Sequence, residues 1–256
     1  MSTDSLEPDQ PVFTAADLVA YKRARRLLPN IVPPQSVVLA FQSHLTNHVK
    51  RKHATRQVRI FDADLHLLKR SNYQLGLICG FGTGSSITAA LVDLLAAFGV
   101  RRFIAIGLAG GLQEGQAAGH LVISRAAIRD EGVSRHYLPS AEIVESSKEM
   151  AEGLGAVLAR QMQSFSAGVT WTTDAPFREM RGDVLNHQNR GVLAVDMEAA
   201  AIFSVAQANG VSALAAFSIA DTLANGIWRL SDDLQPAQKG LTILFDAAFE
   251  YLNEKR

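Results

Sequence analysis

The sequence predicts an α/β protein in which one mixed central β-sheet is flanked by helices in a three-layer sandwich. Short apolar runs bounded by glycine or polar residues alternate along the chain with longer amphipathic or alanine-rich segments, which is the pattern of such folds. The chain has 256 residues, of which 48% are hydrophobic, enough for one large core. Because no repeat, low-complexity tract or linker divides it, we expect one domain over residues 13–256. Residues 1–12 are polar and acidic and are expected to form a disordered tail.

The first half of the chain contains the clearest boundary signals. Thr14 is a good N-cap for an amphipathic helix that runs to about residue 28. A glycine-rich turn over residues 80–86 opens a helix over residues 87–98, which Gly99 ends. Strands are expected at residues 36–41, 57–61, 65–68 and 75–79, with a short helix after the first.

The second half continues the alternation and ends with a long helix. Its strands are continuously apolar, which is typical of a sheet covered on both faces. We expect strands at residues 103–106, 121–128, 166–171, 191–195 and 211–219, and helices at residues 141–161, before residue 191, at 198–209 and at 235–252.

Composition and charge exclude several classes of function. The formal net charge is +0, whereas a bulk nucleic-acid binder needs a basic face for phosphate contacts. Cys79 is the single cysteine, so the chain forms no internal disulfide, which suits a reducing compartment. No apolar run reaches transmembrane length, and the first residues do not resemble a signal peptide. We therefore expect a cytoplasmic protein with neither nucleic acid nor membrane as a partner.

Three carboxylates interrupt the apolar stretch over residues 192–226. An ionised carboxylate that is taken out of water without partners is costly, so Asp196, Glu198 and Asp221 need an explanation. Glu198 opens a helix at the carboxyl end of one expected strand, and Asp221 follows the end of another. Ligands of open α/β folds bind at that edge of the sheet. We expect Glu198 and Asp221 to be functional and Asp196 to cap its helix.

Two glycine-rich turns, residues 80–86 and 107–111, each follow an expected strand. The backbone amides at a helix N-terminus can bind an anion, and glycine lets a ligand approach closely. The turns lack the lysine of a P-loop and the acid of a dinucleotide site. The basic segment 44–59 is either a further anion site or a solvated face.

Five motifs in register resemble the nucleoside phosphorylase superfamily, which includes uridine phosphorylase, hexameric purine nucleoside phosphorylase and methylthioadenosine nucleosidase. The most specific is Val195-Asp-Met-Glu-Ala-Ala, which is similar to the family's Val-Glu-Met-Glu-Ala/Ser-Ala. Ser218-Ile-Ala-Asp221 resembles the segment that carries the acid at the base. The two glycine-rich turns and the loop 129–139 also match the family's order.

This resemblance implies a role for individual residues. Asp221 and Glu198 would be catalytic, Met197, Glu198 and His136 would bind ribose, and Phe177, Arg178 and Asp221 would bind the base. The side from which phosphate or water attacks would contain Gly82, Gly107, Leu108, Arg59 and Gln42. No metal site and no cofactor are implied, with phosphate as co-substrate.

The departures from the family motifs lie on the attacking side. The Gly-Asp-Pro turn after the first strand is absent, and Ala105 and Leu108 stand where phosphorylases have an arginine and a hydroxyl. The nucleosidases use a glutamate after the first strand, where this chain has Gln42 and His44. Asp221 favours a purine, since protonation of the ring makes a neutral leaving group, whereas the His136 loop favours uridine.

These observations lead to one principal hypothesis and two alternatives. We expect cleavage of the N-glycosidic bond of a purine nucleoside or uridine, with phosphate as acceptor. The alternatives are a nucleoside hydrolase on the same scaffold and a non-catalytic nucleoside-binding protein that lost its phosphate site. Since the family shares active sites between subunits, the resemblance implies a homodimer or a hexamer built from dimers, with Arg59 as the residue lent to the neighbour.

Overall fold

The computed structural model describes residues 11–254, so most of the expected tail over residues 1–12 lies outside the described residues. The helices are α1 (Ala15–Ala24), α2 (Ser43–Lys52), α3 (Ser85–Phe98), α4 (Lys148–Arg160), α5 (Arg181–Asn189), α6 (Ala199–Ala208) and α7 (Gln235–Glu254). The strands are β1 (Ser36–Ala40), β2 (Thr55–Ile60), β3 (Ala63–Leu68), β4 (Leu75–Cys79), β5 (Arg102–Gly111), β6 (Leu121–Asp130), β7 (Ile143–Glu145), β8 (Phe165–Thr173), β9 (Ala194–Asp196), β10 (Ser212–Thr222) and β11 (Arg229–Leu230).

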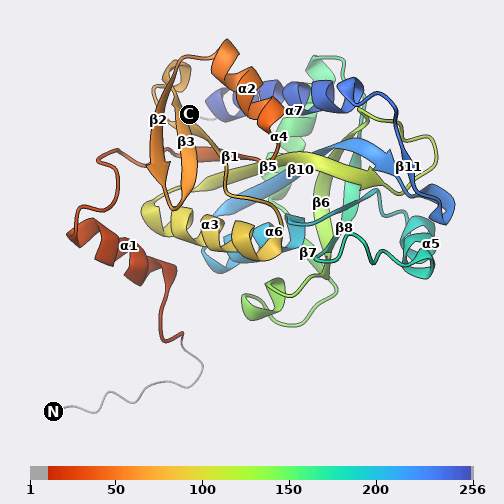
Figure 1. Cartoon of the computed structure of the whole chain (residues 1–256), viewed down its shortest axis with the longest axis horizontal. Helices are drawn as coiled ribbons and strands as arrows, with labels where there is room; N and C mark the ends of the chain where they lie inside the picture. The colour runs from red at the N-terminus through yellow and green to blue at the C-terminus, as the bar shows by residue number, and fades with distance from the viewer. Residues whose placement is uncertain (1–10, 255–256) are drawn as a thin grey trace.

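The expected mixed sheet with helices on both faces is confirmed (Figure 1). In it, α3 and α6 pack together on one face, while α7 packs on the other with α2 and α4 beside it. Each helical layer buries its own cluster of apolar side chains against the sheet. Burial on both sides explains why β1 and β4 are buried at every position and read as continuous apolar runs.

One part of the sheet closes on itself. Strands β10, β6, β8, β9 and β5 pair in that order, and β10 also pairs in parallel with β5, so the path returns to its start. Strands β1, β4, β3 and β2 extend from β5 as an open arm. Sequence patterns did not predict this closure, because pairing between strands 110 residues apart leaves no local signal.

The unequal lengths of β1 and β5 create an opening in the sheet. Strand β1 pairs with β5 as far as Ile106, and β9 joins the same side of β5 only at Gly110. Residues 107–109 therefore lack a neighbouring strand on that side, while β10 pairs with them on the other. A gap of this kind at the carboxyl end of parallel strands is where α/β folds bind ligands.

Four details of the expected elements are wrong. Residues 107–111 are not a turn after a strand that ends at residue 106, because β5 extends to Gly111 and pairs with β10 over these residues. The helix expected over residues 141–161 begins only at Lys148, because residues 143–145 pair with β6 and Ser147 caps the helix. Asp221 does not follow its strand: β10 extends to Thr222 and contains it. The first helix ends at Ala24 rather than near residue 28, although its capping box between Thr14 and Asp17 is present. Within residues 11–254, no helix has the length and apolar character needed to cross a membrane.

Candidate active site

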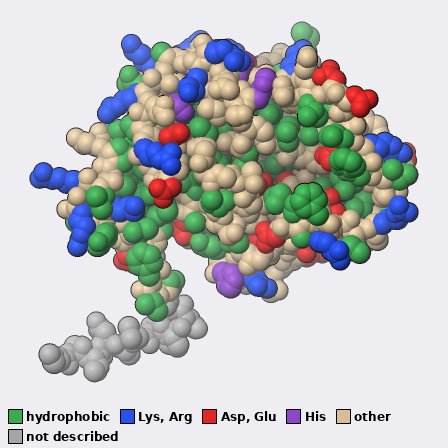
Figure 2. Space-filling model, viewed as in Figure 1, with side chains coloured by type: hydrophobic (Ala, Val, Ile, Leu, Met, Phe, Trp, Pro, Cys, Tyr) green, Lys and Arg blue, Asp and Glu red, His purple; other side chains and the backbone are tan. Residues whose placement is uncertain are grey.

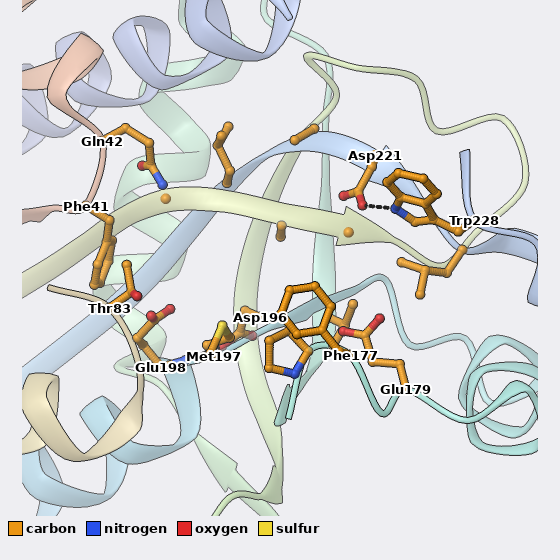
Figure 3. Close-up of a pocket in the computed structure, with 18 residues that line it drawn as sticks. Phe41, Gln42, Thr83, Phe177, Glu179, Asp196, Met197, Glu198, Asp221 and Trp228 are labelled. Carbon is orange, nitrogen blue, oxygen red and sulfur yellow. Dashed lines mark hydrogen bonds between the residues drawn. The ribbon is translucent and has the colours of Figure 1, made fainter. Parts of the chain in front are cut away.

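A cavity of about 700 Å³ lies over the opening in the sheet. It is lined by the end of β1, the glycine-rich turn before α3, the exposed edge of β5, the loop after β8, the start of α6, and β10 with the segment that follows it. Figure 3 shows Phe41 and Gln42 at one end of the cavity and Asp221, Trp228 and Glu179 at the other, with Met197 between them. On the outer surface, hydrophobic and acidic side chains gather on this side of the molecule (Figure 2).

The glycine-rich turn before α3 holds Glu198 beside Thr83, at the Phe41 and Gln42 end of the cavity. The Gly84 amide donates a hydrogen bond of 2.6 Å to Glu198 Oε1, and Gly84 has a φ of +101°, which a residue with a side chain rarely adopts. The Ser85 hydroxyl binds the carbonyl of Met197 at 2.7 Å, so both residues of the motif are tied to the turn. Burial raises the pKa of Glu198 to about 7, against the opposing effect of the Gly84 hydrogen bond.

Asp196 has the local role that its sequence position predicts. Its Oδ1 accepts hydrogen bonds from the amides of Glu198 and Ala199 and from the Thr172 hydroxyl, at 2.8–3.0 Å. The carboxyl therefore caps α6 and holds the backbone that carries Glu198. Its side chain is buried, and burial raises its pKa.

Asp221 lies at one end of the cavity and its carboxyl is fixed in orientation. The indole N–H of Trp228 donates a hydrogen bond of 2.6 Å to Asp221 Oδ2, which leaves Oδ1 for a ligand. The register of β10 against β5 shifts between Ile219 and Asp221, and this irregularity sets the position of the carboxylate. A β-carbon on Gly110 would lie 2.6 Å from Leu223 and 3.5 Å from Asp221 Oδ1, so glycine keeps the floor of this end open.

The loop after β8 contributes Phe177 and Glu179 to the cavity but not Arg178 between them. Neighbouring side chains in non-helical backbone point in different directions, and the Arg178 side chain is exposed. Burial, together with the charge of Asp221, raises the pKa of Glu179 to about 7. Neither Glu179 nor Trp228 was expected to line the site. The sequence contained one indication for Glu179. It lies two residues after Phe177, and side chains two residues apart point to the same side of extended backbone.

The opposite end of the cavity contains amides and apolar groups. Gln42 occupies the N-cap position of α2 without a side-chain capping bond, and its buried Oε1 has no hydrogen-bond partner. Gly107 and Leu108 of β5 complete this end, near Thr83 of the glycine-rich turn. The described residues that line the cavity include four carboxylates and no lysine, arginine or histidine. No three His, Cys, Asp or Glu side chains in the described part of the chain converge as a metal site.

Comparison with known proteins establishes the family. The model of the phosphorylase superfamily matches residues 73–250, which include the strand that carries Asp221 and the helix that Glu198 opens. The chain belongs to the phosphorylase superfamily. The cavity of this superfamily member is built from the same motifs that carry the resemblance in sequence, apart from the 129–139 loop.

Several named relatives align over part of their length. The chain is 28% identical over 157 residues to a uridine phosphorylase of Haemophilus influenzae, covering 56% of this chain and 62% of the relative. It is 30% identical over 151 residues to a guanosine phosphorylase of Halorubrum lacusprofundi, covering 58% and 62%. It is 26% identical over 177 residues to a DeoD-type purine nucleoside phosphorylase of Bacillus cereus, covering 66% and 74%. The matches thus span somewhat less than two thirds of the first two relatives.

Solved structures share the fold over nearly the whole chain. The AMP nucleosidase from Bacteroides thetaiotaomicron superposes with a TM-score of 0.76 at 22% identity, covering 94% of this chain and 99% of that one. The uridine phosphorylase from Vibrio fischeri superposes with a TM-score of 0.75 at 19% identity, covering 88% and 93%. At 22% and 19% identity, these superpositions show that the chain has the same fold as the two solved structures.

Four of the expected site residues lie outside the cavity of the single subunit: Gly82, Arg59, His136 and Arg178. Gly82 has a φ of +100° and shapes the turn whose next residue, Thr83, reaches the cavity. Arg59 lies on the β2–β3 hairpin, where it binds Asp64 at 3.3 Å and remains 64% exposed.

His136 is carried away from the cavity by its loop. It is exposed in the short turn η2 (Ser134–His136), which contacts α6. The next residue, Tyr137, donates a hydrogen bond of 3.0 Å to Asp93 on α3, and burial raises the Tyr137 pKa to about 12. The loop is therefore anchored to the helical layer beneath the sheet.

Proposed function

We propose that the protein cleaves the N-glycosidic bond of a purine nucleoside, with phosphate as the acceptor. The observation that carries this proposal is the arrangement of the cavity, in which Met197 lies between Asp221 at one end and Gln42, Thr83 and Glu198 at the other. The uridine, guanosine and purine nucleoside phosphorylases among the relatives support this type of reaction.

Each group has a place in the reaction. As the bond between C1′ and the base nitrogen breaks, positive charge develops on the sugar and negative charge on the base. Glu198 binds the ribose hydroxyls and holds the sugar, while Asp221 donates a proton to the base as it leaves. A phosphate oxygen attacks C1′ from the side of Gln42 and Gly107, which yields the free base and a ribose 1-phosphate. Phe177 lies where it can stack on the base.

Phosphate is an anion, and the end of the cavity near Gln42 and Gly107 has no positively charged side chain among its described lining residues. The N-termini of α2 and α3 supply amides and the positive ends of two helix dipoles. Phosphate binding normally also uses charged donors. We therefore propose a homodimer, alone or within a hexamer, in which Arg59 of each subunit reaches the cavity of the other. The Arg59 side chain is 64% exposed, and in reaching the other cavity it would exchange its contacts with Asp64 and the Asp62 carbonyl for the phosphate.

Replacing Arg59 with alanine is expected to raise the KM for phosphate at least about tenfold, because one charged contact is lost. Arg56→Ala is the matched control, since Arg56 is exposed on the same strand. Sharing between subunits is tested by co-expressing Arg59→Ala chains with chains that carry Glu198→Gln. Mixed dimers contain one intact site and should recover activity at low phosphate concentration, where both parents are impaired. A fully active monomer in light scattering would rule out this role.

Hydrolysis is the second candidate function, and a specific observation favours it. The described lining of the cavity has four carboxylates and no cation, so a water molecule enters at lower electrostatic cost than a phosphate dianion. The two candidates differ in their sugar product. A panel of nucleosides is incubated with and without phosphate, and base and sugar are identified. Formation of ribose 1-phosphate that depends on phosphate supports phosphorolysis, whereas free ribose at an unchanged rate contradicts it.

Trp228 is expected to position Asp221 through its indole N–H. Trp228→Phe removes the 2.6 Å hydrogen bond and keeps an aromatic ring, so kcat should fall about tenfold with little change in KM. Trp228→Ala additionally removes the ring and should raise KM. If Trp228→Phe retains the kcat of the wild type, the ring and not the hydrogen bond is what the site uses.

A further inference from the structure

Two neighbouring cavities flank the C-terminal end of α7, away from the active site. The larger, of about 720 Å³, lies between the end of α2, the short turn η1 (Lys69–Ser71) and α7, which packs beside α2 (Figure 1). The smaller, of about 540 Å³, lies at the first residues of β1, β4 and β5, whereas the active site lies at their carboxyl ends. Asn253 lines both cavities, and Arg70 of the larger is followed by Ser71 of the smaller, so the two adjoin.

The acids of the larger cavity are already paired with cations. Lys52 Nζ lies 2.6 Å from a carboxylate oxygen of Asp246. Arg160, at the end of the adjacent helix α4, lies 2.7 Å from Glu250 and 2.8 Å from Glu254. Each acid of this wall therefore has a cationic partner, and a ligand meets the groups that are left.

Two guanidinium groups are left without an acidic partner, Arg70 in the larger cavity and Arg102 in the smaller. Neither side chain forms a hydrogen bond or an ion pair with another residue of the described range 11–254. When Arg160 is counted with the described lining, four cations face three acids. The planar guanidinium fork matches the oxygens of a phosphate or a carboxylate. An anionic ligand is therefore favoured.

The remaining polar groups suit the hydroxyls of a sugar. Amide and hydroxyl side chains donate and accept hydrogen bonds, as sugar hydroxyls do. Those that line the two cavities are Gln35, Ser71, Gln74, Gln161 and Asn253. His53 also lines the larger cavity; it is 8% exposed, and its Nε2 has no hydrogen-bond partner among the described residues. A buried polar atom of this kind gains from a ligand that supplies the missing bond.

The aromatic rings of the larger cavity are covered, which argues against a nucleotide. The His53 ring packs on Phe249 with 4.7 Å between the ring centroids, and the guanidinium of Arg70 lies over Phe249 at 5.8 Å. The described lining of the smaller cavity has no aromatic residue. A base would therefore find no open ring to stack on, in contrast to the active site, where Phe177 is 97% exposed.

We propose that the two cavities form one binding site for a phosphorylated sugar, separate from the active site. The phosphate group binds Arg70 and Lys52 at one end. The sugar hydroxyls bind the amides of Asn253 and Gln74, beside Arg102, at the other. This site goes beyond the proposed cleavage of nucleosides, and its test needs no turnover.

Calorimetry with ribose 5-phosphate and glucose 6-phosphate tests the proposal on the intact chain. Arg70→Gln should weaken binding at least about tenfold, because a charged hydrogen bond is lost, and Arg102→Gln should weaken it several-fold. Arg51→Gln, at an exposed position of α2 outside both cavities, is the matched control and should bind like wild type. Unchanged affinity in Arg70→Gln or in Arg102→Gln, or no binding of either sugar phosphate to wild type, would overturn the proposal.

Three further probes identify the part of the ligand that is recognised. Inorganic phosphate and ribose should each bind at least about tenfold more weakly than ribose 5-phosphate, since each makes only part of the contacts. Phosphate that binds as tightly as ribose 5-phosphate would overturn the assignment to a sugar. AMP that binds more tightly than ribose 5-phosphate, with the same loss in Arg70→Gln, would identify a nucleotide site and overturn it as well.

Glu198→Gln separates this site from the active site. Ribose 5-phosphate should bind Glu198→Gln as it binds wild type, and Arg70→Gln should cleave nucleosides at the rate of wild type. Binding that is lost in Glu198→Gln and kept in Arg70→Gln would place the ligand in the active site, against the proposal. If wild type binds ribose 5-phosphate through Arg70 but cleaves no nucleoside, the proposed function fails and this inference stands.

Discussion

Glu198→Gln is expected to lower nucleoside cleavage about 10³-fold and at the same time to stabilise the protein above pH 7. The loss of activity follows from the ribose hydroxyls, each of which makes a stronger hydrogen bond to a carboxylate than to an amide. The loss should fall on kcat as well as KM, because the sugar becomes positively charged only in the transition state.

The gain in stability follows from the raised pKa of Glu198. Burial raises that pKa from 4.5 to about 7, so the folded state holds the proton more tightly than the unfolded state does. The contribution to stability is fully present below pH 4.5 and is lost as the pH rises through 7. Glutamine does not titrate, so the variant avoids this loss.

Urea unfolding at pH 5 and pH 8 measures the effect. The difference in free energy of unfolding between Glu198→Gln and wild type should be larger at pH 8 than at pH 5. Glu179 and Asp196, whose pKa values are also raised, are present in both proteins and do not contribute to the difference. Glu152→Gln, whose side chain is 60% exposed, should show no such pH dependence. The same difference at both pH values would mean that Glu198 titrates normally.

Asp221→Asn is expected to lower kcat for purine nucleosides by roughly 10²–10³-fold, because an amide cannot transfer a proton to the departing base. Substrate affinity should change little, since asparagine retains the shape of the side chain and an oxygen that accepts from Trp228. Asp232→Asn, at an exposed position after β11, is the matched control.

A substrate that needs no proton distinguishes acid catalysis from simple misfolding. The base of 7-methylguanosine carries a positive charge and leaves as a neutral molecule without protonation. Asp221→Asn should therefore cleave 7-methylguanosine at nearly the rate of wild type while it remains slow with guanosine. Equal defects with both substrates would show that Asp221 binds the base and does not protonate it.

Elements defined by local signals were predictable from the sequence. Strand β4 has the expected bounds, residues 75–79, because an apolar run followed by glycine encodes both the strand and its end. The capping box at Thr14 and the cap at Asp196 use neighbours within three residues. The motif around Met197 lines a cavity together with the glycine-rich turn before α3 and the glycine-rich end of β5.

Elements that depend on distant pairing were not predictable. Residues 143–145 look helical in isolation and form a strand because β6 offers an edge. Adjacent residues were expected to bind the base together, yet the turn of the loop sends Phe177 and Glu179 into the cavity and Arg178 outward. Trp228 meets Asp221 only because β10 and β11 fold back on each other.

The sequence by itself therefore determined the family, the alternation of strands and helices and the carboxylates that do not belong in an apolar stretch. These are local properties, which each segment expresses whatever its neighbours do. Only the tertiary structure decided that the pairing of β5 with β10 closes the ring of strands. The same holds for the described lining of the cavity, which has four carboxylates and no cation, and for Glu179, which lies at the same end of the cavity as Asp221. Those features are set by contacts between distant segments, and the electrostatic cost of bringing like charges together exists only once the chain has folded.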